Sequence, residues 1–330
     1  MKNLLLQNKE RLPWVGSFIA LLFVPLFFWD FNYGLTIVCF IMLYIVAVSG
    51  LDILYGYCGQ ISLGHVGFFG IGAYGSAMLQ HYFGVPAFVG IIMASALGAF
   101  VGAIIAYPAS KLVFHFLSLA TMAFGEIMRQ FVANSPGRIT GNSLGFFAPR
   151  LSIFGFTLDS TAKYYYFCLI CVFFFLTIKN RLAHSRVGRA FMAIRENPAA
   201  ASGMGVNVVR YKVIAFTTSA FYTAFAGAMY MYLMRYISPE AVVFRQSVMF
   251  LTMLLFGGTA SLWGPIWGSA VIIFLNDALR FAERFQMLVY GILLLLVILV
   301  LPGGVYGESV KLINKIRNRK KKDIKPNAES

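Results

Sequence analysis

Two charged side chains, Glu126 and Arg129, lie within an apolar stretch of the chain. A spacing of three residues places both on one face of a helix, where they can form an ion pair. Inside a bilayer an ionisable side chain costs about 2.5–3.5 kcal/mol unless it is paired or hydrated. The pattern therefore indicates a structural pair facing the interior of a helical bundle, or a polar patch along the route of a solute. Asp52 and Asp277 lie near the ends of apolar stretches, where we expect water or a partner to reach them.

Two glycine-rich segments share the pentad G-x-x-S-L, at residues 59–63 and 258–262. Dense glycine permits close helix crossings and broken helices, and such segments in corresponding halves of a chain point to a transport pathway. Ser62, His65 and Ser261 are therefore candidate polar residues of a pathway or of the core. We expect His65 to be a hydrogen-bonded structural histidine, and we treat an internal repeat as a hypothesis.

No set of residues that would form an enzyme active site appears. The G-x-G-x-x-G match at residues 70–75 lacks the strand and the ribose-binding acid of a dinucleotide site, and the motifs of zinc proteases, serine hydrolases and P-loop ATPases are missing. All four cysteines lie in apolar segments, and the C-x-x-C at residues 168–171 has no second pair beside it. We expect no enzyme activity and no cofactor or metal in this chain.

The composition is that of a membrane protein, with 59% hydrophobic and 12% charged residues. Apolar windows predict an all-α polytopic membrane protein with about ten transmembrane or half-membrane helices and Gly-rich broken segments. Residues 1–330 are expected to form a single transmembrane domain. The predicted spans lie near 13–30, 33–54, 60–80, 85–107, 112–133, 164–180, 211–234, 246–262, 265–281 and 286–302. Whether the spans near 60–80, 246–262 and 265–281 cross fully is open.

The formal net charge of +15 resides mostly in loops and in the tail. In a soluble protein this charge would suggest nucleic acid, but here it indicates topology and contact with anionic lipid. The distribution of Lys and Arg, with Lys179 counted among the cytoplasmic loop charges, predicts that both termini are cytoplasmic. A polybasic cytoplasmic tail is expected at about 308–330. The external segment 133–163 is either a plain connecting loop, or it forms a lip over a translocation path or receives an external partner.

A basic loop at about 181–210 is rich in Ala and Gly and contains its own helix signals. Asn197 can cap a helix, Pro198 fits the first helical position, and three alanines follow. Such an ordered helix, with small residues on one face, is typical of a loop that docks onto a cytoplasmic partner. A loop that only connects two spans does not need it.

Several motifs together resemble the inner-membrane permeases of branched-chain amino-acid ABC importers, the LivM type. The resembling segments run in order from about residue 35 to residue 304: GYCGQISLGHVGFFGIGAY, LATMAFGEIMR, ITGNSLG, SRVGRAFMAIRENPAAASGMGVNVVRYKVIAF, YISP, LFGGTASLWGPIWGSA and GILLLLVILVLP. One departure is Asp52, which stands where this family more often carries Asn.

The resemblance implies a bacterial inner-membrane, multi-pass permease that moves branched-chain amino acids by alternating access. Its implied partners are a second related permease subunit, two cytoplasmic ATP-binding subunits and a periplasmic solute-binding protein. The resemblance also marks the loop at about 181–210 as the coupling loop. The implied contacts to the ATPase are Arg195, Glu196, Asn197, Ala200, Gly205 and Asn207.

Two other functions remain open at this point. One is the permease of an ABC importer for urea or short amides, which shares the same architecture. The other, in a different class, is an ion-coupled secondary transporter, because Gly-rich broken segments suit it too. The scarcity of acids in the middle of the predicted spans disfavours the second.

Overall fold

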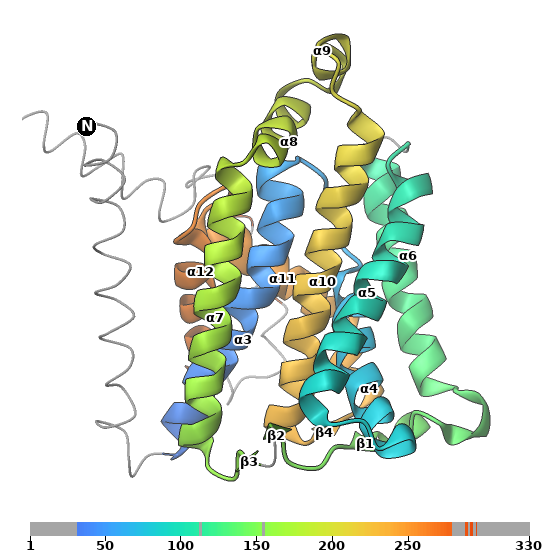
Figure 1. The fold of residues 1–330 in the computed structure, drawn as a ribbon, viewed down its shortest axis with the longest axis vertical. Helices are drawn as coiled ribbons and strands as arrows, with labels where there is room; N and C mark the ends of the chain where they lie inside the picture. Colours follow the sequence, from blue (N-terminus) through green and yellow to red (C-terminus); the bar gives the residue numbers. More distant parts are fainter. Residues whose placement is uncertain are drawn as a thin grey trace, which may run out of the picture.

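The computed structural model describes residues 32–111, 114–153 and 156–278, and five positions between 288 and 295. The predicted first span and the basic tail lie outside these residues, as does most of the predicted last span. Within the described part, long helices run side by side and form one bundle (Figure 1). This arrangement confirms the prediction of an all-α polytopic membrane protein.

Six long helices correspond to predicted spans. They are α3 (Asn32–Asp52), α4 (His65–Phe83), α5 (Ala87–Ala109), α6 (Phe114–Ala133), α7 (Thr161–His184) and α10 (Val208–Met234). A short π-helix, η1 (Ile53–Tyr57), continues α3. Among the described residues, four segments are long and apolar enough to cross a membrane: Tyr33–Tyr57, Ala87–Ala109, Thr161–His184 and Val208–Met234.

Two shorter helices, α11 (Phe244–Gly257) and α12 (Gly264–Ala278), pack against each other as a hairpin. The two helices pack closely at Gly268, where an added Cβ atom would lie only 1.8 Å from the Met253 carbonyl oxygen. At a rise of about 1.5 Å per residue, the 14 residues of α11 extend about 21 Å. A bilayer core is about 30 Å thick, so α11 is a half-membrane helix by length, as the sequence allowed.

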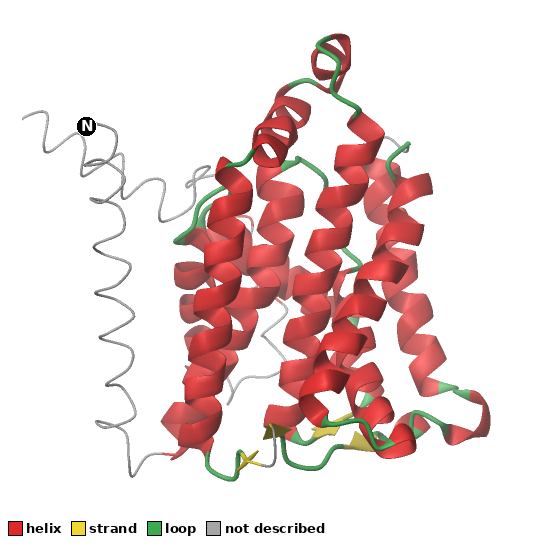
Figure 2. Ribbon diagram, in the orientation of Figure 1, coloured by secondary structure: helices red, strands yellow, loops and turns green. Residues whose placement is uncertain are grey.

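Short strands and turns occupy one end of the bundle (Figure 2). Strand β1 (Phe146–Phe147) pairs antiparallel with β4 (Tyr236–Ile237), and β2 (Ser152–Ile153) pairs with β3 (Phe156–Thr157). Three single-turn 3₁₀ helices, η2 (Pro136–Arg138), η3 (Asn142–Leu144) and η4 (Pro239–Val242), lie in the same segments. The predicted external segment 133–163 is therefore folded onto the bundle through its pairing with the YISP segment.

Two helices project from the opposite end of the bundle, α8 (Arg186–Glu196) and α9 (Pro198–Gly203) (Figure 1). Below we refer to these two ends as the α8 end and the strand end.

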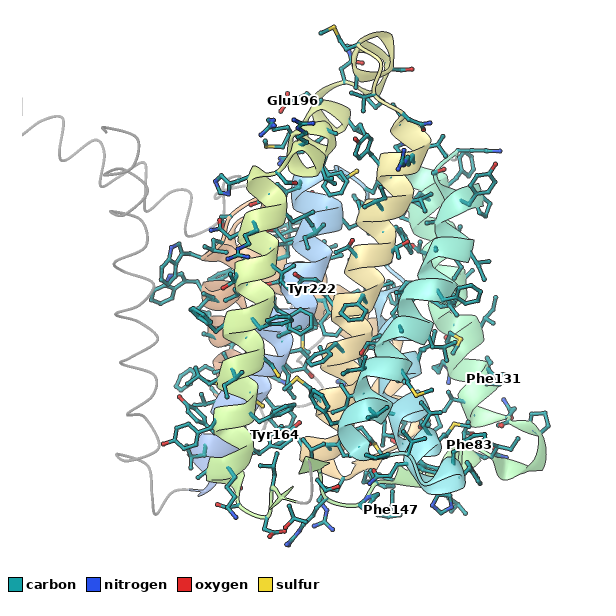
Figure 3. All side chains as sticks on the ribbon, viewed as in Figure 1. Phe83, Phe131, Phe147, Tyr164, Glu196 and Tyr222 are labelled. Atoms are coloured by element: carbon teal, nitrogen blue, oxygen red, sulfur yellow. The ribbon has the colours of Figure 1, made fainter. Side chains whose placement is uncertain are left out.

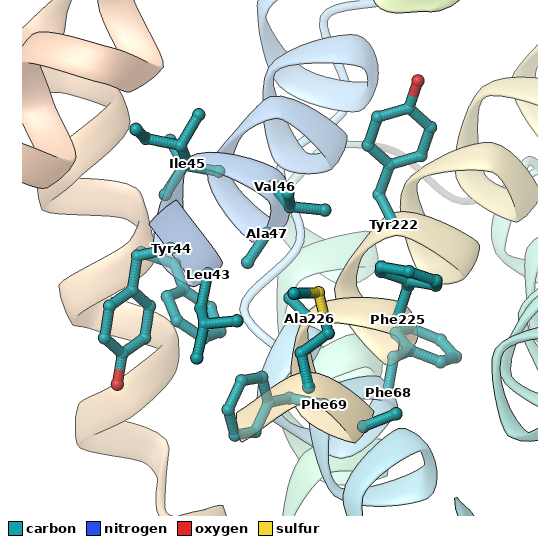
Figure 4. Packing of buried hydrophobic residues seen from close by; sticks show 14 of the residues in the cluster. Leu43, Tyr44, Ile45, Val46, Ala47, Phe68, Phe69, Tyr222, Phe225 and Ala226 are labelled. Carbon is teal, nitrogen blue, oxygen red and sulfur yellow. The ribbon is translucent and has the colours of Figure 1, made fainter. Parts of the chain in front are cut away.

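Helix α10 lies at the centre of the bundle and packs against α3, α4 and α5. Glycine allows the closest of these approaches. A Cβ atom on Gly72 of α4 would lie 1.8 Å from the Ala224 carbonyl oxygen, and one on Gly227 of α10 would lie 2.0 Å from the Phe69 carbonyl oxygen. Aromatic and aliphatic side chains, among them Phe69 and Tyr222, fill the space around the crossing (Figure 4).

Candidate functional site

The loop between α7 and α10 is a pair of capped helices that stands outside the bundle. The Ser185 hydroxyl accepts hydrogen bonds from the backbone N–H groups of Val187 and Gly188 at 3.1 and 3.3 Å, which begins α8. The buried side chains Phe191 and Ile194, each 1% exposed, hold α8 against the bundle. The sequence analysis missed α8, although a Ser cap before buried residues spaced three apart was the available signal.

Helix α9 begins where the sequence predicted it. The Asn197 side-chain oxygen accepts from the N–H groups of Ala199 and Ala200 at 3.0 and 3.1 Å, and Pro198 occupies the first helical position. These bonds satisfy N–H groups that a helix start otherwise leaves without partners. Helix α9 has six residues, and its cap fixes how the loop turns away from α8.

The other candidate residues of this loop fall into two groups, those exposed on its surface and those that fix its backbone conformation. Glu196 is exposed at the end of α8, where Figure 3 labels it, and Ala200 is exposed on α9. Gly205 has a φ of +84°, a left-handed conformation that favours glycine. Asn207 caps α10 by accepting from the Arg210 N–H at 3.0 Å. Met204 is 86% exposed, and the sequence analysis did not single it out as a contact residue.

Arg195 links this loop to the bundle. Its Nη1 atom donates a hydrogen bond to the carbonyl oxygen of Gly56 in η1. Its aliphatic stem lies over Gly59, where an added Cβ would come within 3.1 Å of the Arg195 Cγ. The implied contact of Arg195 with the ATPase stays a prediction, and the structure adds that its guanidinium bonds the bundle.

A buried ion pair lies inside the bundle beside η1, at the residue that precedes this helix. The Lys179 Nζ atom lies 2.7 Å from an Asp52 carboxylate oxygen, and both side chains are 0% exposed. Asp52 therefore has one of the two expected neighbours, a partner, and that partner is the buried Lys179 of this same chain. The assignment of Lys179 to the cytoplasmic loop charges is wrong, because its side chain is buried in α7. The available signal was a basic residue inside a predicted apolar span, since a charge there requires an opposite charge nearby.

The same two side chains hold the second Gly-rich break, residues 258–263 between α11 and α12. The other Asp52 carboxylate oxygen accepts from the Ala260 N–H at 2.7 Å. Lys179 donates to the Ser261 carbonyl oxygen at 2.9 Å. The Ser261 hydroxyl accepts from the N–H of Gly264, the first residue of α12, at 2.8 Å. The structure therefore places Ser261 beside the ion pair, where it bonds the start of α12.

The first Gly-rich break, residues 58–64 between η1 and α4, is held by His65. Its Nδ1 atom lies 2.9 Å from the Ser62 hydroxyl, and its Nε2 atom lies 2.6 Å from the Ser219 hydroxyl on α10. Ser62, His65 and Ser219 are all at most 2% exposed. His65 thus has the hydrogen-bonded structural placement that we expected, and Ser219 is a partner that sequence reasoning missed.

The two pentads share part of their local geometry. Each begins with a glycine of positive φ, +72° at Gly59 and +111° at Gly258. Each places its serine three residues before the first residue of the following helix. Their surroundings differ, because Gly64 approaches Thr121 of α6 and Gly264 approaches Gly258 of its own break. The internal repeat stays a hypothesis.

Glu126 and Arg129 form the expected ion pair, at 2.5 Å, but on the outer face of α6. The Glu126 side chain is 49% exposed and the Arg129 side chain 31%. The interpretation that the pair faces the interior of this chain's bundle is therefore wrong. Gln130 donates to Glu126 at 3.1 Å and Asn134 to Gln130 at 3.0 Å, so a polar row runs along α6 towards the strand end.

Comparisons with known proteins identify the family of the chain. The family model "Branched-chain amino acid transport system / permease component" matches residues 33–298. The "High-affinity branched-chain amino acid transport system permease protein LivM" of Escherichia coli (strain K12) is 30% identical over 287 residues, which is 80% of this chain and 67% of that protein. Its namesake in Salmonella typhimurium (strain LT2) has the same identity and coverage.

A more distant relative is the "Probable branched-chain amino acid transport permease protein LivM" of Methanocaldococcus jannaschii, 23% identical over 66% of this chain and 68% of that protein. No solved structure matches the chain significantly. The family is one of membrane transport components and not a class of enzymes. By the extent of the family match and the apolar helices of its bundle, the chain belongs to the permease components of branched-chain amino acid transport systems and is a multi-pass membrane protein.

Proposed function

We propose that this chain is the transmembrane permease subunit of an ATP-binding-cassette importer that moves branched-chain amino acids across a bacterial inner membrane. Separate ATPase subunits would drive the bundle between outward-open and inward-open states, each favoured by a different ligand state. In this proposal the chain itself binds no nucleotide, cofactor or nucleic acid. The two curated relatives at 30% identity, both described as high-affinity branched-chain amino acid permeases, support the choice of solute.

The observation that carries the proposal is the projecting pair α8 and α9. This pair is capped at both starts, so it has a defined shape, and it presents Glu196, Ala200 and Met204 away from the bundle. Small residues such as Ala200 allow another backbone to approach closely, and Met204 offers an adaptable apolar contact. We infer that this surface sits on a cytoplasmic ATPase subunit.

The outer face of α6 supports a second permease subunit as partner. Charged side chains inside a membrane almost always face a bundle interior or a water-filled cavity. The row that contains Glu126 and Arg129 is exposed in this chain by itself. A related permease against α6 would shield this row from lipid, and a solute path between the two subunits would hydrate it. We therefore place Glu126 and Arg129 beside the translocation path.

The remaining partners follow from this orientation. With the α8 end in the cytoplasm, the strand end would face the periplasm and receive the periplasmic solute-binding protein. Both termini would be cytoplasmic, and the basic tail would contact anionic lipid. The binding protein would supply most of the selectivity among solutes.

Transport into proteoliposomes tests the proposal. This chain, its second permease, the two ATPase subunits and the binding protein would be reconstituted and supplied with radiolabelled leucine or urea. We expect leucine uptake that requires ATP and the binding protein. ATP-dependent uptake of urea with no uptake of leucine would identify an amide importer. Leucine uptake by this chain alone, driven by a Na⁺ or H⁺ gradient, would identify a secondary transporter and overturn the proposal.

The docking surface is tested by co-purification of the ATPase subunits with tagged permease. Glu196→Ala combined with Gly205→Val should weaken their recovery and lower uptake, while the permease still inserts into the membrane. Glu240→Ala is the matched control for recovery of the ATPase subunits, since Glu240 is an exposed acid at the opposite, strand end. Full ATPase recovery and full uptake in the Glu196/Gly205 variant would show that the coupling surface lies elsewhere.

A further inference from the structure

The buried ion pair Asp52–Lys179 holds together three segments that are far apart in the sequence. Asp52 ends α3, Lys179 lies near the end of α7, and Ala260 and Ser261 lie in the break between α11 and α12. Asp52 binds the N–H of Ala260 at 2.7 Å and Lys179 binds the carbonyl of Ser261 at 2.9 Å. The pair therefore binds the backbone of the break at two points, an N–H group through Asp52 and a carbonyl group through Lys179.

The break that it holds has an unfavourable backbone conformation. Ala260 has a φ of +53°, which few residues other than glycine, asparagine and aspartate adopt. Such a conformation persists only where its surroundings impose it, and it is common in segments that switch. Here the bond from the Ala260 N–H to Asp52 is one of the contacts that impose it.

The same group is connected to the coupling loop. Gly56, one turn after Asp52, has no room for a side chain, because an added Cβ would lie 1.9 Å from the Asp52 carboxylate and 2.6 Å from the Ala260 nitrogen. The carbonyl oxygen of Gly56 accepts the hydrogen bond from Arg195 on α8. Arg195 therefore connects α8 directly to the turn that packs over Asp52 and Ala260.

We propose that the Asp52–Lys179 ion pair is a mechanical joint between η1 and the break between α11 and α12. When α8 moves, η1 moves with it, and the ion pair transmits this movement to the break. Asp52 and Lys179 are positioning residues in this proposal, since neither is assigned a contact to the solute. The inference rests on the proposed function and adds a mechanical route within this chain. It identifies the hairpin of α11 and α12 as the element that responds to the ATPase.

Burial explains why a charged pair suits this role. Two fully buried opposite charges attract strongly because little water screens them, and separating them leaves each without compensation. The three segments therefore move together or not at all. A neutral pair at the same positions would fill the same space but would link the segments more weakly.

The test compares single and double neutral replacements in the reconstituted importer. Asp52→Asn and Lys179→Met alone each leave one buried charge, so both should lower the amount of folded permease. The double variant leaves no charge and should restore folded protein, measured by gel filtration and by Tm in detergent. Its leucine uptake per ATP hydrolysed should nevertheless fall about fivefold or more, the range of ordinary coupling between sites.

A variant of Arg195 provides the second part of the test. Arg195→Gln should lower uptake per ATP by a similar factor, because it releases α8 from Gly56. If Arg195 and the ion pair act in series, adding Arg195→Gln to the double variant should cause little further loss, whereas independent sites would multiply their effects. Thr177→Val is the matched control on α7, since the Thr177 hydroxyl bonds the Phe173 carbonyl of its own helix, and it should leave the ratio unchanged.

Three outcomes separate the interpretations. A folded double variant with the wild-type ratio of uptake to ATP hydrolysis would make the pair purely structural and overturn the joint. Multiplicative losses with Arg195→Gln would overturn the serial connection to α8. If the wild-type complex shows no ATP-dependent uptake, the proposed function fails first, and that result is independent of either variant.

Discussion

The Nε2 atom of His65 lies 2.6 Å from the hydroxyl oxygen of Ser219, which joins the start of α4 to the middle of α10 inside the bundle. The other ring nitrogen of His65 lies 2.9 Å from the hydroxyl of Ser62. The His65 side chain thus holds the first Gly-rich break against α10, because one ring nitrogen bonds Ser62 in the break and the other bonds Ser219 on α10.

Replacing Ser219 by Ala should destabilise the permease by about 1–3 kcal/mol. The change leaves one nitrogen of a fully buried imidazole without a partner, and an unsatisfied buried group costs roughly that amount. Thermal unfolding of the purified permease in detergent measures the effect. Thr218→Val is the control, because Thr218 bonds the Ile214 carbonyl of its own helix. An unchanged Tm for Ser219→Ala would show that the bond contributes nothing.

Gly72→Ala should disrupt the crossing of α4 and α10. The added methyl group would lie 1.8 Å from the Ala224 carbonyl oxygen, so two backbones would have to separate. Overpacking typically costs about 1–3 kcal/mol, and a rigid backbone obstacle places this site at the upper end. Gly203→Ala adds the same methyl group where nothing lies within 4 Å, and its Tm should stay within error of wild type. Equal Tm values for the two variants would contradict the crossing geometry.

Asn197→Ala should weaken the start of α9 by about 1 kcal/mol, the usual value of a helix cap. The variant loses the acceptor for the N–H groups of Ala199 and Ala200. We expect normal membrane insertion but lower recovery of the ATPase subunits and lower ATP-driven uptake. Asn197→Asp keeps the acceptor and should retain most of the uptake. If Ala and Asp at this position behave alike, capping is not what Asn197 contributes.

Glu126→Gln with Arg129 left intact should lower assembly or transport. The replacement removes the carboxylate that binds Arg129 at 2.5 Å and leaves the Arg129 guanidinium, on a predicted span, without its counter-charge. The double replacement Glu126→Gln/Arg129→Gln leaves no such charge. It should restore assembly, and it should restore transport only if the pair has no role in the path. Recovery of both permeases by co-purification and uptake per assembled complex separate these effects. Wild-type assembly and transport in Glu126→Gln would exclude both roles.

The pair of strands β2 and β3 at the strand end should lose stability in acid. Hydrogen bonds from Thr157 and Arg150 lower the pKa of Asp159, which lies outside the membrane spans. Because the folded pKa lies below the unfolded one, this contribution is complete above the unfolded pKa and is lost as pH falls through the folded pKa. Amide hydrogen exchange of residues 150–153 and 156–159, compared between wild type and Asp159→Asn, should differ at neutral pH. The two should converge in strong acid, and equal exchange at neutral pH would contradict the prediction.

The sequence by itself determined the helical membrane class and most of the helix positions. A run of about 20 apolar residues indicates a transmembrane helix. The predicted spans 85–107 and 211–234 accordingly correspond to α5 and α10. Local rules also sufficed for the start of α9, because a helix cap depends only on residues next to one another, here Asn197 and Pro198. The spacing of Glu126 and Arg129 likewise fixed that the two side chains pair.

Tertiary structure alone decided which polar residues from different helices meet and which face of a helix is buried. Asp52 and Lys179 are 127 positions apart, and no local pattern states that α3 and α7 pack side by side with both charges buried. The spacing of Glu126 and Arg129 could not say whether their shared face turns inward or outward, because that depends on which neighbours cover α6. Periodicity describes one helix at a time, whereas burial is a property of the packed bundle.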